Sequence, residues 1–170
     1  MVLSRMKPAF PVVMNWTRTP EQTSAEPAVI RAKALELLAR REHSRLELRQ
    51  KLLQRGFPAE PIGLVLEQLA AERLLDEGRY AELYACSRAD KGYGPLRIAR
   101  ELRERGVPEE IVTATLAMLE DSWPAKLRDL HHKRFKSHYP ADVAGRMQQT
   151  RVLRQHGFTL DQIKQLFATD

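Results

Sequence analysis

Two glycines directly before a basic stretch are the residues of this sequence that most resemble a chemical site. Residues 88–106 read RADKGYGPLRIARELRERG, and a glycine-rich loop that opens a helix can bind phosphate through free backbone N–H groups. A Walker A loop has four residues between its glycines and then Gly-Lys-Ser/Thr, whereas a dinucleotide loop has GxGxxG. The segment from Gly92 to Pro95 has neither pattern, and Pro95 removes one N–H donor. We therefore expect a hinge between two helices.

Other residue types with metal or nucleophile chemistry occur without the partners that such chemistry needs. His131, His132 and His138 are not spaced i, i+4 and lie among cations, so we expect a basic surface instead of a metal site. Cys86 is the only cysteine, and we expect it to be a buried small hydrophobic residue. The chain has no GxSxG motif and no recognisable nucleophile–base pair. The sequence predicts a protein that is not an enzyme and uses no cofactor.

The composition favours helices and a negatively charged partner. Hydrophobic residues make up 43% of the chain, charged residues 29% and aromatic residues only 6%, which is typical of a globular helical protein and argues against a β-sandwich or barrel. The formal net charge is +6, so the surface attracts nucleic acid or an acidic protein. The single cysteine fits a reducing compartment, and neither a signal peptide nor an apolar membrane span is recognisable. We expect a cytoplasmic protein.

The helices expected to carry these residues repeat along the chain. Gly56, Gly106 and Gly157 are 50 and 51 residues apart. Apolar residues stand at matching offsets around them: Leu52, Leu102 and Leu153; Phe57, Val107 and Phe158; Ile62, Val112 and Ile163; Leu66, Leu116 and Phe167. Each glycine is expected to end a helix in the left-handed conformation, and Pro58 or Pro108 to open the next one. The two helices on either side of each glycine thus form a helical hairpin, and a further helical stretch precedes each hairpin.

The pattern predicts an all-α fold, a tandem array of three three-helix repeats that forms an elongated, curved molecule. We expect a flexible leader over residues 1–27 and repeats over 28–72, 73–121 and 122–170. Ser44 and Glu47 form an S-x-x-E capping box where the second helix of the first repeat should begin. A compact bundle of six to nine helices with accidental internal similarity is the alternative.

Two groups of cations are candidate contacts to a partner or to DNA. The first surrounds the glycine turn and comprises Arg88, Lys91, Arg97 and Arg100 with the aromatic Tyr93 among them. The second comprises Lys126, Lys133, Arg134 and Lys136. A solvated helix face is the alternative for both groups. In the first group Glu101 and Glu104 lie four residues after Arg97 and Arg100, so part of its charge is expected to pair internally.

The segments ALELLARREHSRLELRQKLLQRGF and LLDEGRYAELYACSRADKGYGPLRIARELRERGV resemble the bacterial RecX family, regulators of the RecA recombinase. The resemblance covers about residues 28–170, is strongest from Leu74 to Val107 and is looser in the third copy, where Thr159 replaces the proline. LDEGRYA, Arg88 and KGYGP occur in the family's order and spacing.

This resemblance implies an array of three-helix units that lies in the helical groove of the RecA filament on DNA. It implies inhibition of RecA ATP hydrolysis, strand exchange and coprotease activity, and hence control of recombinational DNA repair and the SOS response. Single- or double-stranded DNA is a possible second partner, and a monomer is expected. A helix-turn-helix DNA-binding protein is the alternative function, because short helices joined at glycine turns also fit that motif.

Overall fold

The protein is a chain of helices joined by short turns. The computed structural model describes residues 26–168, and residues 1–25 of the predicted leader lie outside the described part. Within the described residues the regular elements are all helical, and they fall into three successive groups of three. The groups are α2 (Pro27–Leu38), α3 (Arg45–Leu53) and α4 (Ala59–Ala71); α5 (Glu77–Asp90), α6 (Pro95–Glu104) and α7 (Glu109–Met118); and, after the 3-10 turn η1 (Glu120–Ser122), α8 (Trp123–Phe135), α9 (Val143–Gln155) and α10 (Leu160–Ala168).

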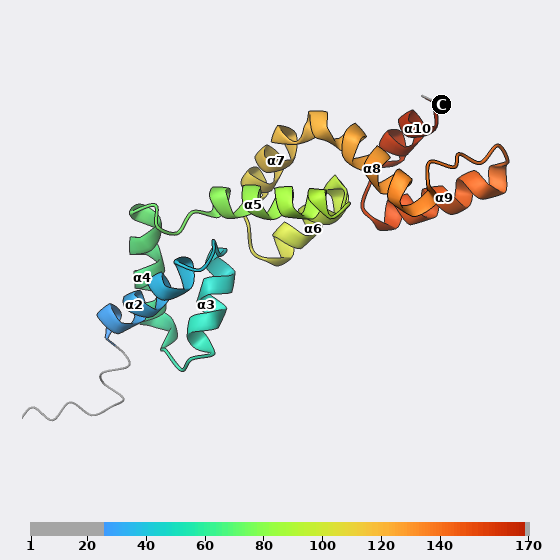
Figure 1. Ribbon diagram of the computed structural model, residues 1–170. Helices are drawn as coiled ribbons and strands as arrows, with labels where there is room; N and C mark the ends of the chain where they lie inside the picture. Colours follow the sequence, from blue (N-terminus) through green and yellow to red (C-terminus); the bar gives the residue numbers. More distant parts are fainter. Residues whose placement is uncertain (1–25, 169–170) are drawn as a thin grey trace, which may run out of the picture.

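The three groups lie end to end in an elongated, curved molecule, with α2–α4 at one end and α9 and α10 at the other (Figure 1). The predicted all-α tandem array of three three-helix repeats is therefore confirmed, and the single compact bundle is wrong. We call the groups repeats 1, 2 and 3. No helix between residues 26 and 168 has the length and apolar character needed to cross a membrane.

Two hydrophobic clusters hold the array together. Repeat 1 has its own cluster, in which Leu52 and Leu69 are fully buried. Repeats 2 and 3 share the other, in which Leu102 from α6 is buried together with Leu127 from α8 and Phe158 beside α10. The molecule thus consists of one small unit and one larger unit, although its sequence repeats three times.

The three aligned glycines end the second helix of each repeat as predicted. Gly56, Gly106 and Gly157 have φ values of +84°, +75° and +97°, in the left-handed region where a side chain is strained. The apolar residue after each glycine folds back onto the helix. For example, the Val107 N–H donates to the Leu102 carbonyl at 3.2 Å. This geometry is the helix stop with an apolar return contact that the repeated pattern indicated.

The third repeat replaces the proline at the start of its last helix with a capping box. The Thr159 hydroxyl accepts from the Gln162 N–H at 3.1 Å, and the Gln162 side chain accepts from the Thr159 N–H at 3.0 Å. The predicted box at Ser44 is only half formed. The Ser44 hydroxyl accepts from the Glu47 N–H, but the Glu47 carboxylate binds Arg41 instead of the cap. Both the complete box at Thr159 and the half-formed box at Ser44 provide a side-chain acceptor for a backbone N–H group at the start of a helix.

Neighbouring repeats meet through equivalent positions, which we number from the glycine of each repeat. At the first junction, the Ser44 hydroxyl of repeat 1 donates to the Arg105 carbonyl of repeat 2 at 2.8 Å. At the second junction, the Gly94 N–H of repeat 2 donates to the His156 carbonyl of repeat 3, also at 2.8 Å. Ser44 and Gly94 both stand twelve residues before their glycine, so the array repeats its docking geometry as well as its fold.

Helix α9 departs from this pattern at its start. It begins at Val143, one turn earlier than α6 begins relative to the glycine that follows. Gly145 is the equivalent of Ser44 and Gly94, and its N–H donates to the Asp142 side chain at 2.9 Å. Asp142 therefore caps α9 and occupies the Gly145 N–H, the repeat 3 equivalent of the Gly94 N–H that bonds repeat 3 at the second junction.

Candidate partner interface

The glycine turn between α5 and α6 is a fixed contact of the second junction. The N–H groups of Gly94 and Leu96 donate to the carbonyls of His156 and Gly157 at 2.8 and 3.0 Å. A Cβ atom on Gly94 would lie 2.6 Å from the backbone of Gly157, so only glycine fits there. The expected connection between two helices is confirmed, because Pro95 opens α6, and repeat 3 additionally holds the turn in place. The N–H groups of Gly94 and Leu96 are already hydrogen-bonded, so neither is available to a phosphate.

A buried carboxylate organises the predicted cations around this turn. Glu101 is 8% exposed and accepts hydrogen bonds from the side chains of Arg88 (2.7 Å), Arg97 (3.0 Å) and Tyr84 (2.8 Å). Burial alone raises the pKa of Glu101, but hydrogen bonds from Arg88, Arg97 and Tyr84 outweigh it and lower the pKa to about 2. Burial and the bond to Glu101 raise the pKa of Tyr84 to about 12. The cluster is thus an internal ion pair network at neutral pH.

Tyr93 completes this cluster with its aromatic ring. The guanidinium carbons of Arg88 and Arg97 lie 3.8 and 4.3 Å from the ring centroid. The ring of His156 stacks against Tyr93 with the centroids 5.7 Å apart. Cation–π and stacking contacts at these distances hold the ring between repeats 2 and 3. Arg88, Tyr93 and Arg97 therefore support the second junction.

The other candidates divide into paired and exposed residues. Lys126 donates to the Asp90 carboxylate at 2.6 Å and so bridges α8 to α5. Arg100 lies 3.6 Å from Glu104 in the expected i, i+4 pair, with both side chains mostly exposed. The candidates whose side chains are exposed and available to a partner are Lys91, Arg100, Lys133, Arg134 and Lys136.

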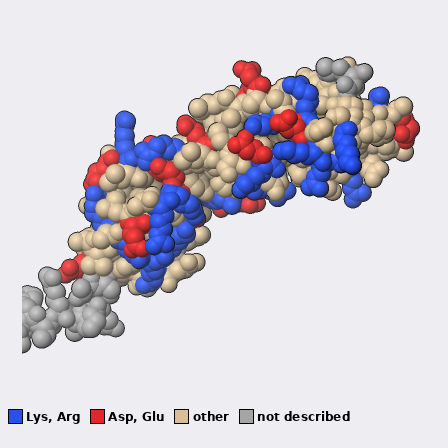
Figure 2. All heavy atoms as spheres, in the orientation of Figure 1, with Lys and Arg blue, Asp and Glu red and all other residues tan. Residues whose placement is uncertain are grey.

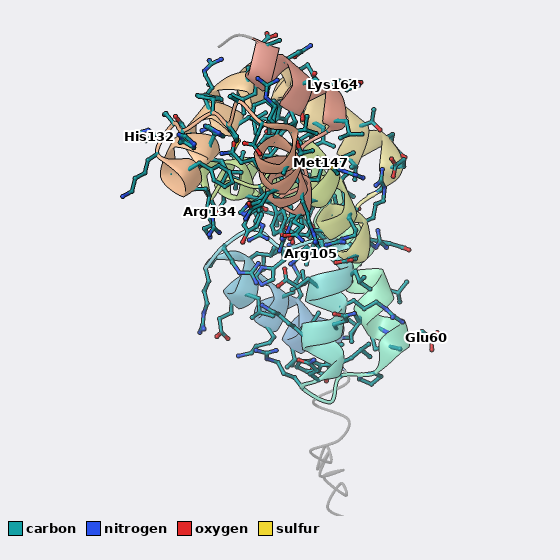
Figure 3. The ribbon with its side chains drawn as sticks, turned by 90° about the vertical axis from the view of Figure 1, so that its right-hand side faces the viewer. Glu60, Arg105, His132, Arg134, Met147 and Lys164 are labelled. Carbon is teal, nitrogen blue, oxygen red and sulfur yellow. The ribbon has the colours of Figure 1, made fainter. Side chains whose placement is uncertain are left out.

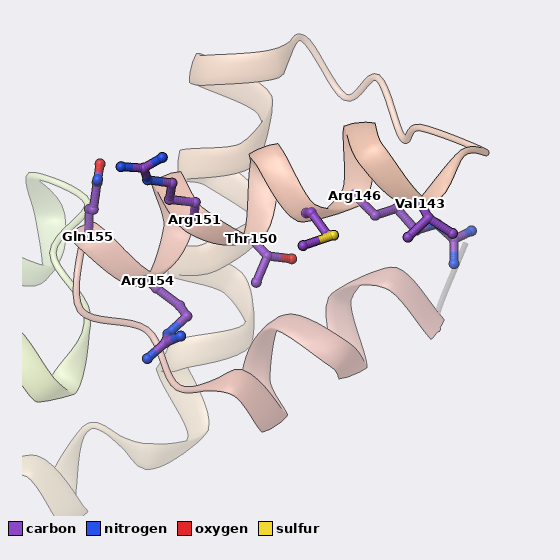
Figure 4. A pocket seen from close by; sticks show the side chains of 7 residues that line it. Val143, Arg146, Thr150, Arg151, Arg154 and Gln155 are labelled. Atoms are coloured by element: carbon purple, nitrogen blue, oxygen red, sulfur yellow. The ribbon is translucent and has the colours of Figure 1, made fainter.

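Helix α9 carries three cations that the sequence analysis did not select: Arg146, Arg151 and Arg154. They line an open trough of about 620 Å³ along the helix, together with the exposed Val143 and Met147 (Figure 4). The signal was present in the sequence, because residues 143–155 contain three arginines and no acidic residue. These arginines are separated along the sequence by polar and apolar residues, whereas the cations at the end of α8 form a nearly continuous run.

The positive charge of the described array concentrates in repeat 3. Residues 122–170 contain nine Lys and Arg and four Asp and Glu, whereas residues 73–121 contain eight Lys and Arg and ten Asp and Glu. Lys and Arg side chains lie over both ends of the molecule, and those toward the C-terminal end have few Asp and Glu side chains beside them (Figure 2). Long-range attraction of a negatively charged partner should therefore act mainly on repeat 3.

Two expectations about single residues are wrong. His131 is fully buried and not part of a basic surface, because its ring packs on Tyr139 and its Nε2 lies 2.9 Å from the Gln149 side-chain oxygen. Cys86 is exposed on α5, since the buried face of that helix is taken by residues such as Ala85 and Ala89. No group of three potential metal ligands occurs within residues 26–168.

Comparisons with known proteins agree with the three-helix units. Residues 31–69 match the family model "RecX, first three-helix domain", and residues 76–116 match "RecX, second three-helix domain". The regulatory protein RecX of Halorhodospira halophila is 45% identical over 143 residues, which cover 84% of this chain and 89% of that protein. The regulatory protein RecX of Pseudomonas fluorescens is 42% identical over 139 residues, covering 82% and 90%.

Solved structures share the fold at lower sequence identity. The crystal structure of RecX from Lactobacillus salivarius is similar with a TM-score of 0.70 and 19% identity, over 84% of this chain and 95% of that one. A second crystal structure of a regulatory protein RecX has a TM-score of 0.65 and 22% identity, over 88% and 79%. The helical array is therefore the architecture of these proteins as well.

Proposed function

The chain belongs to the RecX family, and we propose that it is a non-enzymatic, cytoplasmic regulator that binds the RecA filament on DNA. Bound there as a monomer, it inhibits RecA ATP hydrolysis, strand exchange and coprotease activity, and so restrains recombinational repair and the SOS response. The observation that carries this proposal is the similarity to regulatory proteins RecX over more than four fifths of the chain.

The shape and charge of the array support the proposal. An elongated, curved array offers a long surface to a filament (Figure 1). The excess of Lys and Arg over Asp and Glu is largest in repeat 3. Under this proposal Lys91, Arg100, Lys133, Arg134 and Lys136 contact the partner, while Arg88, Tyr93, Arg97 and Lys126 hold the second junction in the shape that presents them.

The test is RecA's ATP hydrolysis on single-stranded DNA, with this protein titrated in below the RecA concentration and with DNA in excess. Inhibition well below one molecule per RecA subunit is expected if the protein blocks or caps the filament. Absence of inhibition, or inhibition only when the protein is abundant enough to coat the DNA, would overturn the proposal. Arg49→Glu reverses a charge at an exposed residue of α3 in repeat 1 and should inhibit as the wild type does, which controls for nonspecific effects of charge.

Direct DNA binding is the second candidate function, and the cations at the end of α8 favour it. Lys133 and Lys136 are exposed and lack an ion pair with any carboxylate of the described residues. Such cations release counterions from DNA, so Lys133→Glu with Lys136→Glu should weaken DNA binding and flatten its dependence on salt. A sequence-specific footprint would favour the helix-turn-helix alternative, whereas binding that ignores sequence would count against it.

A further inference from the structure

The outer face of α9 is an apolar surface without a neighbour in the array. Val143 and Met147 are 74% and 68% exposed and point into the trough of Figure 4. Met147 stands ten residues before its glycine, as Leu46 and Leu96 do. Repeat 2 docks at Leu46, because a Cβ on Gly106 would lie 2.9 Å from that side chain, and repeat 3 docks at the Leu96 backbone. The outer face of α9 therefore lies at the next docking position of the array.

This face continues toward the second junction. A smaller depression is lined by Leu96, Arg97, Arg100, Arg154, Gln155 and Gly157, and it shares Arg154 and Gln155 with the trough. Leu96 is 58% exposed. Exposed aliphatic side chains thus extend from α6 along α9 with arginines beside them, at the end of the molecule that faces the viewer in Figure 3. We call this combined surface the α9 face.

The charges of the α9 face lack partners within the described chain. Arg151 and Arg154 are exposed, and neither forms an ion pair with a carboxylate of residues 26–168. The Arg146 side chain donates only to the Pro140 carbonyl, at 2.9 Å. In repeat 1, by contrast, Arg31, Arg41 and Lys51 each pair with a glutamate. An occupant of the α9 face must therefore supply negative charge.

Two occupants fit this surface poorly. A second copy docked through its repeat 1 would bring the turn at Gly56, whose flanking Lys51 and Arg55 would repel the arginines of α9. Nucleic acid supplies the negative charge, but the apolar faces of its bases stack mainly on aromatic side chains, and none lines the α9 face. An acidic protein segment with aliphatic side chains satisfies both features, in the manner of a helix laid into a groove.

We infer that the α9 face binds an acidic protein segment that presents aliphatic side chains. This inference rests on the proposed function, under which the segment belongs to RecA and not to the DNA that RecA carries. Met147 and Val143 then anchor the segment, and Arg151 and Arg154 pair with its carboxylates. The cations at the end of α8 belong to a different contact.

The test compares two probes with two variants of the full chain. The probes are a fluorescent single-stranded oligonucleotide and RecA assembled on the same oligonucleotide with a slowly hydrolysed ATP analogue. Met147→Ser removes the aliphatic anchor without changing charge, and Arg151→Glu with Arg154→Glu reverses two charges. Arg49→Glu with Arg55→Glu on repeat 1 is the matched control for charge. Circular dichroism and thermal melting check that each variant folds, which is expected because all these side chains are exposed.

We expect Met147→Ser to weaken binding to the RecA filament at least fivefold and to leave binding to the bare oligonucleotide within twofold. The arginine double variant should weaken filament binding at least tenfold and should exceed its control. Equal losses on both probes would show that the α9 face contacts nucleic acid and would overturn the inference. Unchanged filament binding by Met147→Ser would also overturn it.

The same data separate the inference from the function on which it rests. A wild-type protein that neither binds nor inhibits the RecA filament removes the proposed function, and the assignment of the segment to RecA with it. A wild-type protein that inhibits RecA, with both variants inhibiting equally well, removes only the role of the α9 face.

Discussion

The two junctions of the array use equivalent positions with different chemistry. At the first, a side chain makes the central bond, from the Ser44 hydroxyl to the Arg105 carbonyl, and the hydrophobic clusters on its two sides are separate. At the second, backbone groups of Gly94 and Leu96 bond the next repeat, and one hydrophobic cluster spans both sides. The first junction is therefore a polar contact between two units, whereas the second lies inside one.

The largest expected effect is at the glycine of the second junction. Gly157→Ala combines a left-handed φ with a Cβ that would overlap the Cβ of Arg97, so we expect a loss of about 3 kcal/mol in the free energy of unfolding. Gly56→Ala is the control, since its φ is also positive but no atom lies within 4 Å of a new Cβ. It should cost only about 1 kcal/mol in a urea melt. Equal losses would show that the close approach adds nothing.

Glu101→Gln should have the next largest effect, because it leaves Arg88 and Arg97 half-buried without their carboxylate. We expect a loss of about 2 kcal/mol at pH 7. The pKa of Glu101 is lowered from 4.5 to about 2, so its contribution is complete above pH 4.5 and is lost as the pH falls toward 2.

Urea melts of wild type and Glu101→Gln at pH 7, 4 and 3 measure this contribution. The difference between the two proteins should shrink as the pH falls. A difference that stays constant down to pH 3 would mean that Arg88 and Arg97 do not hold the pKa of Glu101 below its usual value.

Ser44→Ala tests the first junction and should have the smallest effect of the three. It removes the cap of α3 and the bond to repeat 2, for a combined loss of about 1.5 kcal/mol. Asp142→Ala on α9 removes a cap but no bond between repeats, so it should cost about 1 kcal/mol. Hydrogen exchange should report local loosening between repeats 1 and 2 for Ser44→Ala only.

The fold could be predicted from the sequence because each repeat marks its own helix ends. Gly56, Gly106 and Gly157 with the apolar residue after each of them define a local geometry that needs no distant partner. The division into two clusters could not be predicted in this way. It depends on which apolar faces of different repeats meet, and the offsets around each glycine do not contain that information.

The candidate interface was predicted only in part, for the same reason. Arg97 and Arg100 look alike along the sequence, yet Arg97 binds the buried Glu101, whereas Arg100 is exposed. Whether a cation is free depends on the burial of its carboxylate neighbour, which only packing decides. His131 shows the same limit, since it stands beside the exposed His132 and Lys133 but faces the core.

Asp142 closes the docking position of repeat 3. An array whose last repeat offered the same free donor as its inner repeats would have an open end, to which further repeats or further molecules could be added like monomers to a polymer. The Asp142 side chain accepts from the Gly145 N–H, and the extra turn of α9 contains this position, at which a further repeat would dock. To add a fourth repeat, one would first have to delete this turn, so that α9 began at the same position before its glycine as α6 does.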